Sequence, residues 1–300
     1  MNDGVFLCNT TFSIGRANGT EITAPGGTTS RLVVNGGTMS VNLLALGYIG
    51  SAGAGYNARP SCVINGGSLN VATYCNIGEN AGSIATVAVS GGALRITGTD
   101  ANSLRVGGGQ SVGGTGTLTL SGNGAIEINN DVNLAYSASS SGTLNLDGGT
   151  LTARNIVKGN GIAGILNFNG GLFRPRTAGS TMRNLTAAYV RTGGARFDTS
   201  LADYTVAQNL LHDPDPEAGT DGGLTKSGTG TLILTGSGST YDGPTQVEGG
   251  TLQVVSDLPP SSAVYVSSDG ELLIGGGATQ VVAAAGLTLS DNATLAVALS

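Results

Sequence analysis

The chain has 300 residues, of which 52 are glycine and 8 are proline; 39% are hydrophobic and 11% are charged. This is too little proline for collagen and too much apolar character for a disordered chain. The formal net charge of -6 and the scattered arginines exclude nucleic acid and anionic membranes, which need clustered basic residues, and no run of about 18 apolar residues is present to cross a membrane.

Neither end of the sequence has the features of a targeting segment. The first residues, MNDGVFLCNTTF, lack the basic and apolar regions of a secretory signal peptide. The last residues, ATLAVALS, have the pattern of an ordinary strand. Both ends resemble interior parts of a repetitive chain, so we expect this sequence to be a segment of a larger protein and to contain no signal peptide.

A strand followed by a turn of small residues recurs six times along the chain. The matching segments are LVVNGGTMSV, CVINGGSLNV, VAVSGGALRI, LTLSGNGAIEI, LNLDGGTLTA and LNFNGGLFRP. Their turns open at Asn35, Asn65, Ser90, Ser121, Asp147 and Asn169, with spacings of 30, 25, 31, 26 and 22 residues. Self-similarity at such a period is typical of solenoids, in which each repeat is one coil.

Each repeat contains more than one strand. Apolar residues alternate on both sides of the turn, and a third element recurs as Ile14-Gly15, Ile49-Gly50, Ile77-Gly78 and Val106-Gly107. Three short strands and three corners predict an all-β fold, a right-handed parallel β-helix with three strands per coil. The alternative is a series of β-hairpins, since Asn-Gly is a strong hairpin signal. Hairpins alone do not explain a three-strand unit, so we favour the solenoid.

The apolar residues beside the turns are expected to form stacked, inward-facing rows. These residues are Leu32, Val34, Val63, Val87, Val89, Leu118, Leu120, Leu144, Leu146 and Leu166. The three cysteines, Cys8, Cys62 and Cys75, permit one disulfide and a spare thiol. Cys62 in CVINGG occupies the position of Leu32 in LVVNGG, so buried thiols are favoured, because buried cysteine behaves as a small hydrophobic residue.

The pattern changes near Arg196. We predict coils with NGG-type turns over 1–195, an acidic irregular coil or loop over 196–222, and further coils of the same solenoid over 223–300. Within the last segment lies GGLTKSGTGTLILTGSGSTYDGPTQVEGGTLQV, at 222–254. It resembles the autotransporter-associated β-strand repeat, also called the passenger-associated transport repeat.

The resemblance rests on four short motifs. They are Leu224-Thr225-Lys226, the run Gly228-Thr229-Gly230-Thr231-Leu232, Thr240-Tyr241-Asp242-Gly243, and Gly249-Gly250-Thr251-Leu252. Pro244 stands where the family usually has glycine or threonine, which is a mild departure. The resemblance implies a β-helical passenger region exported to, or beyond, the outer surface of a Gram-negative-type bacterium, and it implies no catalytic residues.

The only histidine, His212, lies in the segment LLHDPDPEAG. A His-Asp pair activates a nucleophile in hydrolases, but no serine motif accompanies this one, so we interpret His212 as a solvated loop residue. Nearby acids offer the oxygen ligands that Ca²⁺ takes, but their spacing matches neither an EF-hand nor a calcium-binding β-roll, and calcium binding is left open. These acids are Asp213, Asp215, Glu217 and Asp221.

Enzymatic β-helices need clustered acids, whereas Asp100, Asp131 and Asp147 are spread about one per coil. We therefore predict no enzyme, no catalytic, cofactor-binding or metal-binding residue, and no cofactor. The threonines around Thr117 do not recur on every coil, so ice binding is not expected. The tyrosines that we consider for sugar stacking form no stripe; they are Tyr48, Tyr56, Tyr74, Tyr136, Tyr189 and Tyr241.

The predicted function is that of a non-catalytic structural or adhesive β-solenoid segment of a larger bacterial cell-surface or secreted protein. It would act as a rigid spacer or filament-like scaffold outside the cell. The alternative is a carbohydrate-binding or polysaccharide-cleaving β-helix, which rests on fold analogy alone. The expected partners are neighbouring repeats of the same or identical chains, stacked end to end or laterally, and host or environmental glycans; nucleic acid and direct membrane insertion are not expected.

Overall fold

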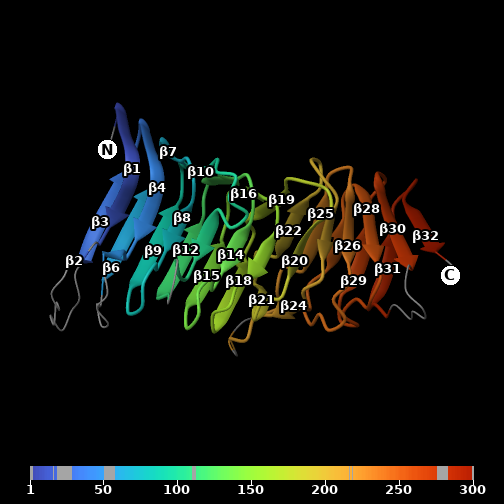
Figure 1. The fold of residues 1–300 in the computed structure, drawn as a ribbon. Helices are drawn as coiled ribbons and strands as arrows, with labels where there is room; N and C mark the ends of the chain where they lie inside the picture. Colours follow the sequence, from blue (N-terminus) through green and yellow to red (C-terminus); the bar gives the residue numbers. More distant parts are fainter. Residues whose placement is uncertain are drawn as a thin grey trace. The chain divides into compact units, whose positions relative to one another are not determined.

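The computed structural model describes residues 3–15, 17–18, 29–50, 58–109, 113–215, 217, 219–275 and 283–298. Two compact units make up the chain, Met1–Ile165 and Leu166–Ser300. Throughout the described residues, every regular element is a β-strand, and every strand pair whose register is known is parallel (Figure 1). The fold is a parallel β-helix, as predicted, and the NGG turns join strands that pair with the neighbouring coils and not with each other.

In the first unit, each full coil is a run of three strands, such as β6–β8, β9–β11, β12–β14 and β15–β17. The strands are β1 (Val5–Ile14), β2 (Ala17–Asn18), β3 (Thr29–Val34), β4 (Thr38–Leu46), β5 (Ile49–Gly50), β6 (Arg59–Ile64), β7 (Ser68–Val71), β8 (Cys75–Ile77), β9 (Ile84–Val89), β10 (Ala93–Ile96), β11 (Leu104–Val106), β12 (Thr115–Leu120), β13 (Ala125–Ile128), β14 (Val132–Leu134), β15 (Ser141–Leu146), β16 (Thr150–Ala153) and β17 (Ile156–Lys158). β18 (Ala163–Phe168) contains the boundary between the units.

The predicted turns lie above one another in successive coils. Asn65 Nδ2 donates to Asn35 Oδ1 at 2.9 Å, and Ser90 Oγ donates to Asn65 Oδ1 at 3.1 Å. Gly67 has a φ of 67°, and a Cβ there would lie 2.4 Å from the carbonyl oxygen of Gly37. The second glycine of the turn is therefore required both by its left-handed backbone and by the close approach of the coil below.

Most of the predicted inward rows are buried. Val34, Leu118 and Leu144, for example, have no exposed surface, and Leu32 pairs with the buried Cys62 as expected. Val63 lies on the outer face, because the alternation in β6 turns its neighbours Cys62 and Ile64 inward. Leu32 itself is only half-buried. The cysteines are free, and Cys62 and Cys75 are buried.

The predicted third element of the repeat, Ile49-Gly50, is wrong in one coil. Ile14 pairs with Leu46, which pairs in turn with Ile77, and Ile77 pairs with Val106. The equivalent dipeptide is therefore Leu46-Gly47, and Ile49-Gly50 forms the separate short strand β5. The reason is the length of β4, which runs through two sides of the coil without a corner.

In the second unit, the coils change from three strands to two. The strands are β19 (Leu172–Pro175), β20 (Ser180–Arg183), β21 (Ala187–Val190), β22 (Ala195–Asp198), β23 (Tyr204–Val206), β24 (Leu210–His212), β25 (Leu224–Ser227), β26 (Thr231–Leu234), β27 (Thr245–Val247), β28 (Gly250–Val254), β29 (Ala263–Val266), β30 (Gly270–Gly275), β31 (Gly286–Leu289) and β32 (Thr294–Ala298). β21–β23 and β24–β26 are three-strand coils, whereas β27–β28, β29–β30 and β31–β32 are two-strand coils.

The departure from three strands has a local cause. In the two-strand coils the third side is formed by segments rich in glycine, serine and proline, TGSGSTYDGP at 235–244 and VSDLPPSS at 255–262, which disfavour strand pairing. The segment 196–222 contains β23, β24 and most of β22, so its irregular part is the loop that follows His212. The domain limits at 195 and 222 stay predictions. No helix in the part of the chain that the structure describes is long and apolar enough to cross a membrane.

Candidate functional site

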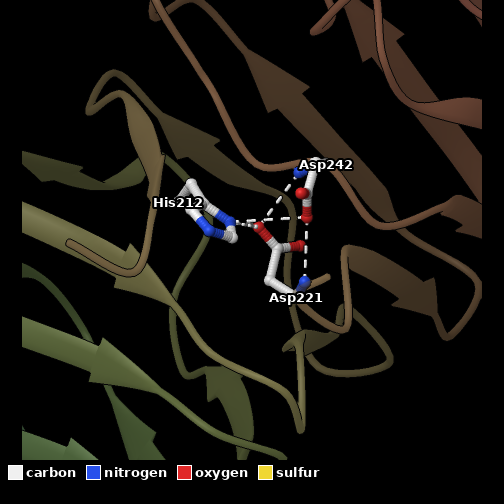
Figure 2. Close-up of side chains that lie close together, drawn as sticks. All are labelled: His212, Asp221 and Asp242. Atoms are coloured by element: carbon white, nitrogen blue, oxygen red, sulfur yellow. Dashed lines mark hydrogen bonds and ion pairs between the residues drawn. The ribbon is translucent and has the colours of Figure 1, made fainter. Parts of the chain in front are cut away.

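Two aspartates occupy equivalent positions in successive coils of the second unit. β25 pairs with β27 in parallel, with Leu224 opposite Thr245. Asp221 lies three residues before Leu224, and Asp242 lies three residues before Thr245, so the two aspartates come next to each other (Figure 2). The backbone N–H of Asp221 donates to Asp242 Oδ1 at 2.8 Å, and the N–H of Asp242 donates to Asp221 Oδ2 at 3.0 Å. Each carboxylate therefore binds the backbone of the other coil.

His212, at the end of β24, faces this pair (Figure 2). Its Nδ1 lies 2.9 Å from Asp221 Oδ2 and 3.4 Å from Asp242 Oδ1. A carboxylate only accepts, so Nδ1 carries the proton in this hydrogen bond. The hydrogen bond to Asp221, with the charges of Asp242 and Asp213, raises the pKa of His212 above its ordinary value, although partial burial opposes the shift. His212 is thus half-buried and ion-paired rather than a free loop residue, contrary to our interpretation of the sequence.

The three side chains offer one ligand atom each within 4.8 Å of one another, which is the spacing of a metal centre. Both carboxylate oxygens of Asp221 are already engaged, however. Asp221 Oδ1 accepts the N–H groups of Gly223 and Gly243, both at 2.9 Å, in addition to the two partners of Oδ2. A metal needs neutral imidazole and free oxygen lone pairs. The hydrogen bonds of Asp221 and His212 make this group a clamp between coils.

The acidic residues singled out in the sequence do gather in space. Asp213, Asp215, Glu217 and Asp221 line one hollow of about 260 Å³, together with Asn169, Arg191, Thr192 and Gly219. Arg191 Nε lies 3.2 Å from Asp213 Oδ2, so a cation already sits against the acids. Asp215 Oδ1 accepts the N–H of Glu217 at 3.0 Å, and Asp213 Oδ1 accepts the N–H of Asp215 at 3.2 Å. These carboxylates stabilise the loop's own turns.

In the first unit, Arg105 is stacked between two tyrosines. Its guanidinium carbon lies 4.3 Å from the ring centre of Tyr74 and 4.5 Å from that of Tyr136. Nη2 forms an ion pair with Asp100 at 3.0 Å, and Nε donates to the carbonyl of Asn102 at 3.0 Å. Two of the tyrosines considered for sugar stacking are therefore occupied by an internal cation, which is a cation–π arrangement.

Glu79 is the most unusual ionisable group of this unit. It is 6% exposed, and its Oε2 has no hydrogen-bond partner among the described residues. Gly109 lies directly against it, since a Cβ at Gly109 would come within 2.4 Å of Glu79 Cγ. Burial raises the pKa of Glu79 to about 7, although Asn76 and Arg105 act in the opposite direction. No residue near Glu79 in the sequence indicates that its side chain is buried, so this group was not predicted.

The segment that resembles a passenger repeat contains two large buried polar side chains. Lys226 is fully buried, and its Nζ donates to the carbonyls of Ser227, Gly228 and Gly249 at 3.1, 2.7 and 2.6 Å. Burial lowers the pKa of Lys226 to about 8. Tyr241, one of the tyrosines considered for sugar stacking, is also buried, and its hydroxyl lies 2.7 Å from Thr245 Oγ1. The motif residues thus hold a corner of the coil together.

Three further acids pair with an arginine of the neighbouring coil. The pairs are Arg95–Glu127 at 3.2 Å, Arg154–Asp131 at 2.7 Å and Arg174–Asp198 at 2.6 Å. The outer face of the first unit also carries a column of hydroxyl side chains, one in each of four successive coils. The column consists of Ser61, Thr86, Thr117 and Thr143, which are in register, and it is longer than we expected. The ion pairs link coils and leave no pair of free carboxylates poised for hydrolysis among these residues.

The comparisons with known proteins agree with this structural role. Residues 224–254 match the family model described as the passenger-associated-transport-repeat. Over 261 residues, 82% of the chain, the sequence is 30% identical to a protein named adhesin BmaC autotransporter, from Brucella suis biovar 1 (strain 1330). The chain spans 7% of the length of that relative. No solved structure matches the chain.

The family match falls on the residues whose contacts have just been described. Lys226 and Tyr241 lie inside it, with Asp242 and Gly243 of the aspartate clamp. Residues 224–254 therefore form a passenger-associated transport repeat, and 82% of the chain is similar to part of an autotransporter adhesin.

Proposed function

We propose that this chain is a non-catalytic structural and adhesive segment of an autotransporter passenger, exposed on the outer surface of a bacterium or secreted from it. The observation that carries the proposal is that the buried and half-buried polar side chains form structural contacts within the coils. Asp221, Lys226 and Arg105, which are the kinds of group an enzyme would use, each bind the backbone or a neighbouring coil. The similarity to an adhesin over 82% of the chain supports the same function.

In this proposal, the coils act as a scaffold and spacer, and the corners present loops to a partner. Strands of a parallel β-helix are held on both edges, so the scaffold is rigid, whereas loops tolerate change of sequence. We expect the partner to be a glycan or a protein of a host or environmental surface, because an adhesin acts outside the cell.

The test is binding by the purified chain to a glycan array and to immobilised matrix proteins and cells. We expect saturable binding that survives substitution of Asp221 or Lys226 by residues that preserve folding, and that is reduced by replacement of whole corner loops with glycine-serine loops. Absence of binding to every surface, for a chain that circular dichroism shows to be folded, would refute the adhesive function and leave the spacer function to stand alone.

A carbohydrate-cleaving function is the second candidate, and the hollow of acids beside Arg191 is the observation that favours it. Release of reducing ends from acidic polysaccharides, with and without Ca²⁺, tests it directly. Loss of activity in Asp213→Asn and Asp215→Asn, with activity kept in the exposed control Glu248→Gln, would establish this function in place of the first. No release of reducing ends from any of these polymers is the result that we expect.

A further inference from the structure

The imidazole of His212 faces two carboxylates with a single proton. Its Nδ1 lies 2.9 Å from Asp221 Oδ2 and 3.4 Å from Asp242 Oδ1 (Figure 2). One N–H group donates one good hydrogen bond, and this bond goes to Asp221. Asp242 Oδ1 thus stands beside Nδ1 without receiving its proton, whereas a cation that takes several ligands would use all three atoms.

The three donor atoms have the spacing of ligands around one metal ion. Zinc binds imidazole nitrogen and carboxylate oxygen at about 2.0–2.2 Å, so neighbouring ligand atoms in its coordination sphere lie roughly 2.9–3.4 Å apart. The distances from His212 Nδ1 to the two oxygens are 2.9 and 3.4 Å, and all three atoms lie within 4.8 Å of one another. A small movement of the side chains therefore brings all three atoms onto one ion.

Only the Nδ1 proton has to leave for an ion to bind. Each carboxylate oxygen has lone pairs for two partners. Asp221 Oδ2 uses one for the N–H of Asp242 and the other for His212, and Asp242 Oδ1 accepts the N–H of Asp221. Once Nδ1 has lost its proton, both oxygens can bind the ion and keep their backbone partners. The clamp between the coils is then retained in a metal-bound form.

The surroundings hold the carboxylate of Asp221 as metal sites hold their ligands. Asp221 Oδ1 accepts the N–H groups of Gly223 and Gly243, both at 2.9 Å, and the side chain is 1% exposed. Outer hydrogen bonds of this kind fix the orientation of ligating carboxylates. The side chains of His212 and Asp242 are 31% and 38% exposed, so water can complete the coordination of an ion.

The charge of the group suits a divalent cation. With neutral His212, Asp221 and Asp242 contribute two negative charges, and the nearby Asp213 is paired with Arg191 at 3.2 Å. Asp221 also lines the acidic hollow of about 260 Å³, and a concave acidic surface attracts cations. Imidazole nitrogen favours Zn²⁺ and its transition-metal neighbours, whereas Ca²⁺ and Mg²⁺ prefer oxygen ligands alone.

We propose that His212 Nδ1, Asp221 Oδ2 and Asp242 Oδ1 bind one divalent transition-metal ion, with Zn²⁺ as the preferred ion, although we predicted no metal-binding residue from the sequence. Binding releases the Nδ1 proton to solvent, and water molecules fill the remaining positions. His212 and Asp221 lie on the two sides of the acidic loop, and Asp242 lies in the next coil, so the ion joins the loop to that coil. This role is structural and is independent of whether the chain is an adhesin.

Isothermal titration calorimetry of the full chain with ZnCl₂ tests the site. The chain is prepared without a polyhistidine tag and treated with EDTA, so His212 is the only histidine present. We expect one Zn²⁺ per chain, a proton released on binding, and an unfolding temperature that rises with the Zn²⁺ concentration, since the ion binds the folded state. An excess of CaCl₂ should not displace the Zn²⁺.

Two variants locate the ion. His212→Gln and Asp242→Asn should each weaken Zn²⁺ binding by at least about 10-fold, which is the lower limit for loss of even an outer-shell partner. Both side chains are partly exposed, so circular dichroism should show the fold of the parent. Asp215→Asn, in the neighbouring hollow, is the matched control and should bind Zn²⁺ like the parent.

Cobalt gives a direct readout of the histidine in the parent chain, which does not depend on the folding of any variant. Co²⁺ is paramagnetic, so Co²⁺ bound through Nδ1 should shift and broaden the ring signals of His212 in the NMR spectrum, and excess Zn²⁺ should remove this effect. Absence of Zn²⁺ binding by the folded parent, or binding that is unchanged in His212→Gln, would overturn the proposal. Binding that is lost in Asp215→Asn and kept in His212→Gln would place the ion in the acidic hollow and would overturn it as well.

Discussion

Asp221 and Asp242 lie in successive coils, and each carboxylate accepts the backbone N–H of the other, at 3.0 and 2.8 Å. Like charges one coil apart repel, yet here the repulsion is offset by five N–H donors, four from the backbone and one from His212. The pair therefore joins two coils at the point where the chain returns from the acidic loop to β25.

Asp221→Ala should lower the free energy of unfolding by about 3 kcal/mol, because it leaves three backbone N–H groups without this acceptor, two of them in buried hydrogen bonds. Asp221→Asn keeps one carbonyl oxygen and should lose about half as much. Urea unfolding followed by circular dichroism measures both, with Glu248→Ala as the exposed control, expected within about 0.5 kcal/mol of the parent. Equal stability of Asp221→Ala and the control would show that the clamp contributes nothing.

His212 should make stability depend on pH. Its pKa in the folded protein is raised above the value of about 6.5 expected in the unfolded chain, so the folded state binds this proton more tightly. The stabilisation is complete below about pH 6.5 and is lost as the pH rises through the folded-state pKa. His212→Gln should remove this part of the pH dependence. Because His212 is the only histidine, its ring resonance in an NMR titration gives the pKa without assignment, and a value at or below 6.5 would contradict the ion pair.

Glu79 should also make the protein less stable as the pH rises, but here the cause is burial of a carboxyl group and not an ion pair. Its pKa, raised by burial to about 7, lies above the value of about 4.3 in the unfolded chain. The carboxyl group is neutral and tolerated at low pH, and the stability is lost as the pH rises through about 7. Glu79→Gln should match the parent at pH 4.5 and exceed it by up to about 3 kcal/mol at pH 8.5. Measuring both proteins in the His212→Gln background separates the two groups, and a variant less stable than the parent at pH 8.5 would contradict the prediction.

The fold was predictable because its signals are local. Period-two alternation identifies strands, and turns such as Asn65-Gly66-Gly67 need a left-handed glycine at a fixed place. Register within a coil was harder to predict. The wrong alignment of Ile49 came from the unbroken strand β4, whose missing corner leaves no turn signal in the sequence.

The candidate site was predictable only in part. Asp221-Gly222 and Asp242-Gly243 precede aligned strands, so an alignment of DGGLT with DGPTQ would have placed the two aspartates together. His212 and Glu79 had no such signal. Their environments come from residues distant in the sequence, such as Asp242 for His212 and Gly109 for Glu79, and depend on how coils of unequal length pack.

Lys226 should be more important for stability than Lys158, the only other lysine of the chain. Lys226 is fully buried and donates to three carbonyls, whereas Lys158 is half-buried and donates to two, those of Gly159 and Gly161 at 3.2 and 2.7 Å.

Replacement of Lys226 by methionine keeps most of the side-chain volume but removes the ammonium donor. The carbonyls of Gly228 and Gly249 then lose this donor, whereas the carbonyl of Ser227 keeps those of Thr199. We expect Lys226→Met to lower the free energy of unfolding by about 2 kcal/mol and Lys158→Met by about half of that, since Lys158 is only half-buried and has two carbonyl partners instead of three. Thermal and urea unfolding at pH 6.5, where Lys226 is charged despite a pKa near 8, measure the two effects under the same protonation state. A larger loss in Lys158→Met than in Lys226→Met would mean that the corner of the transport repeat does not depend on its buried lysine.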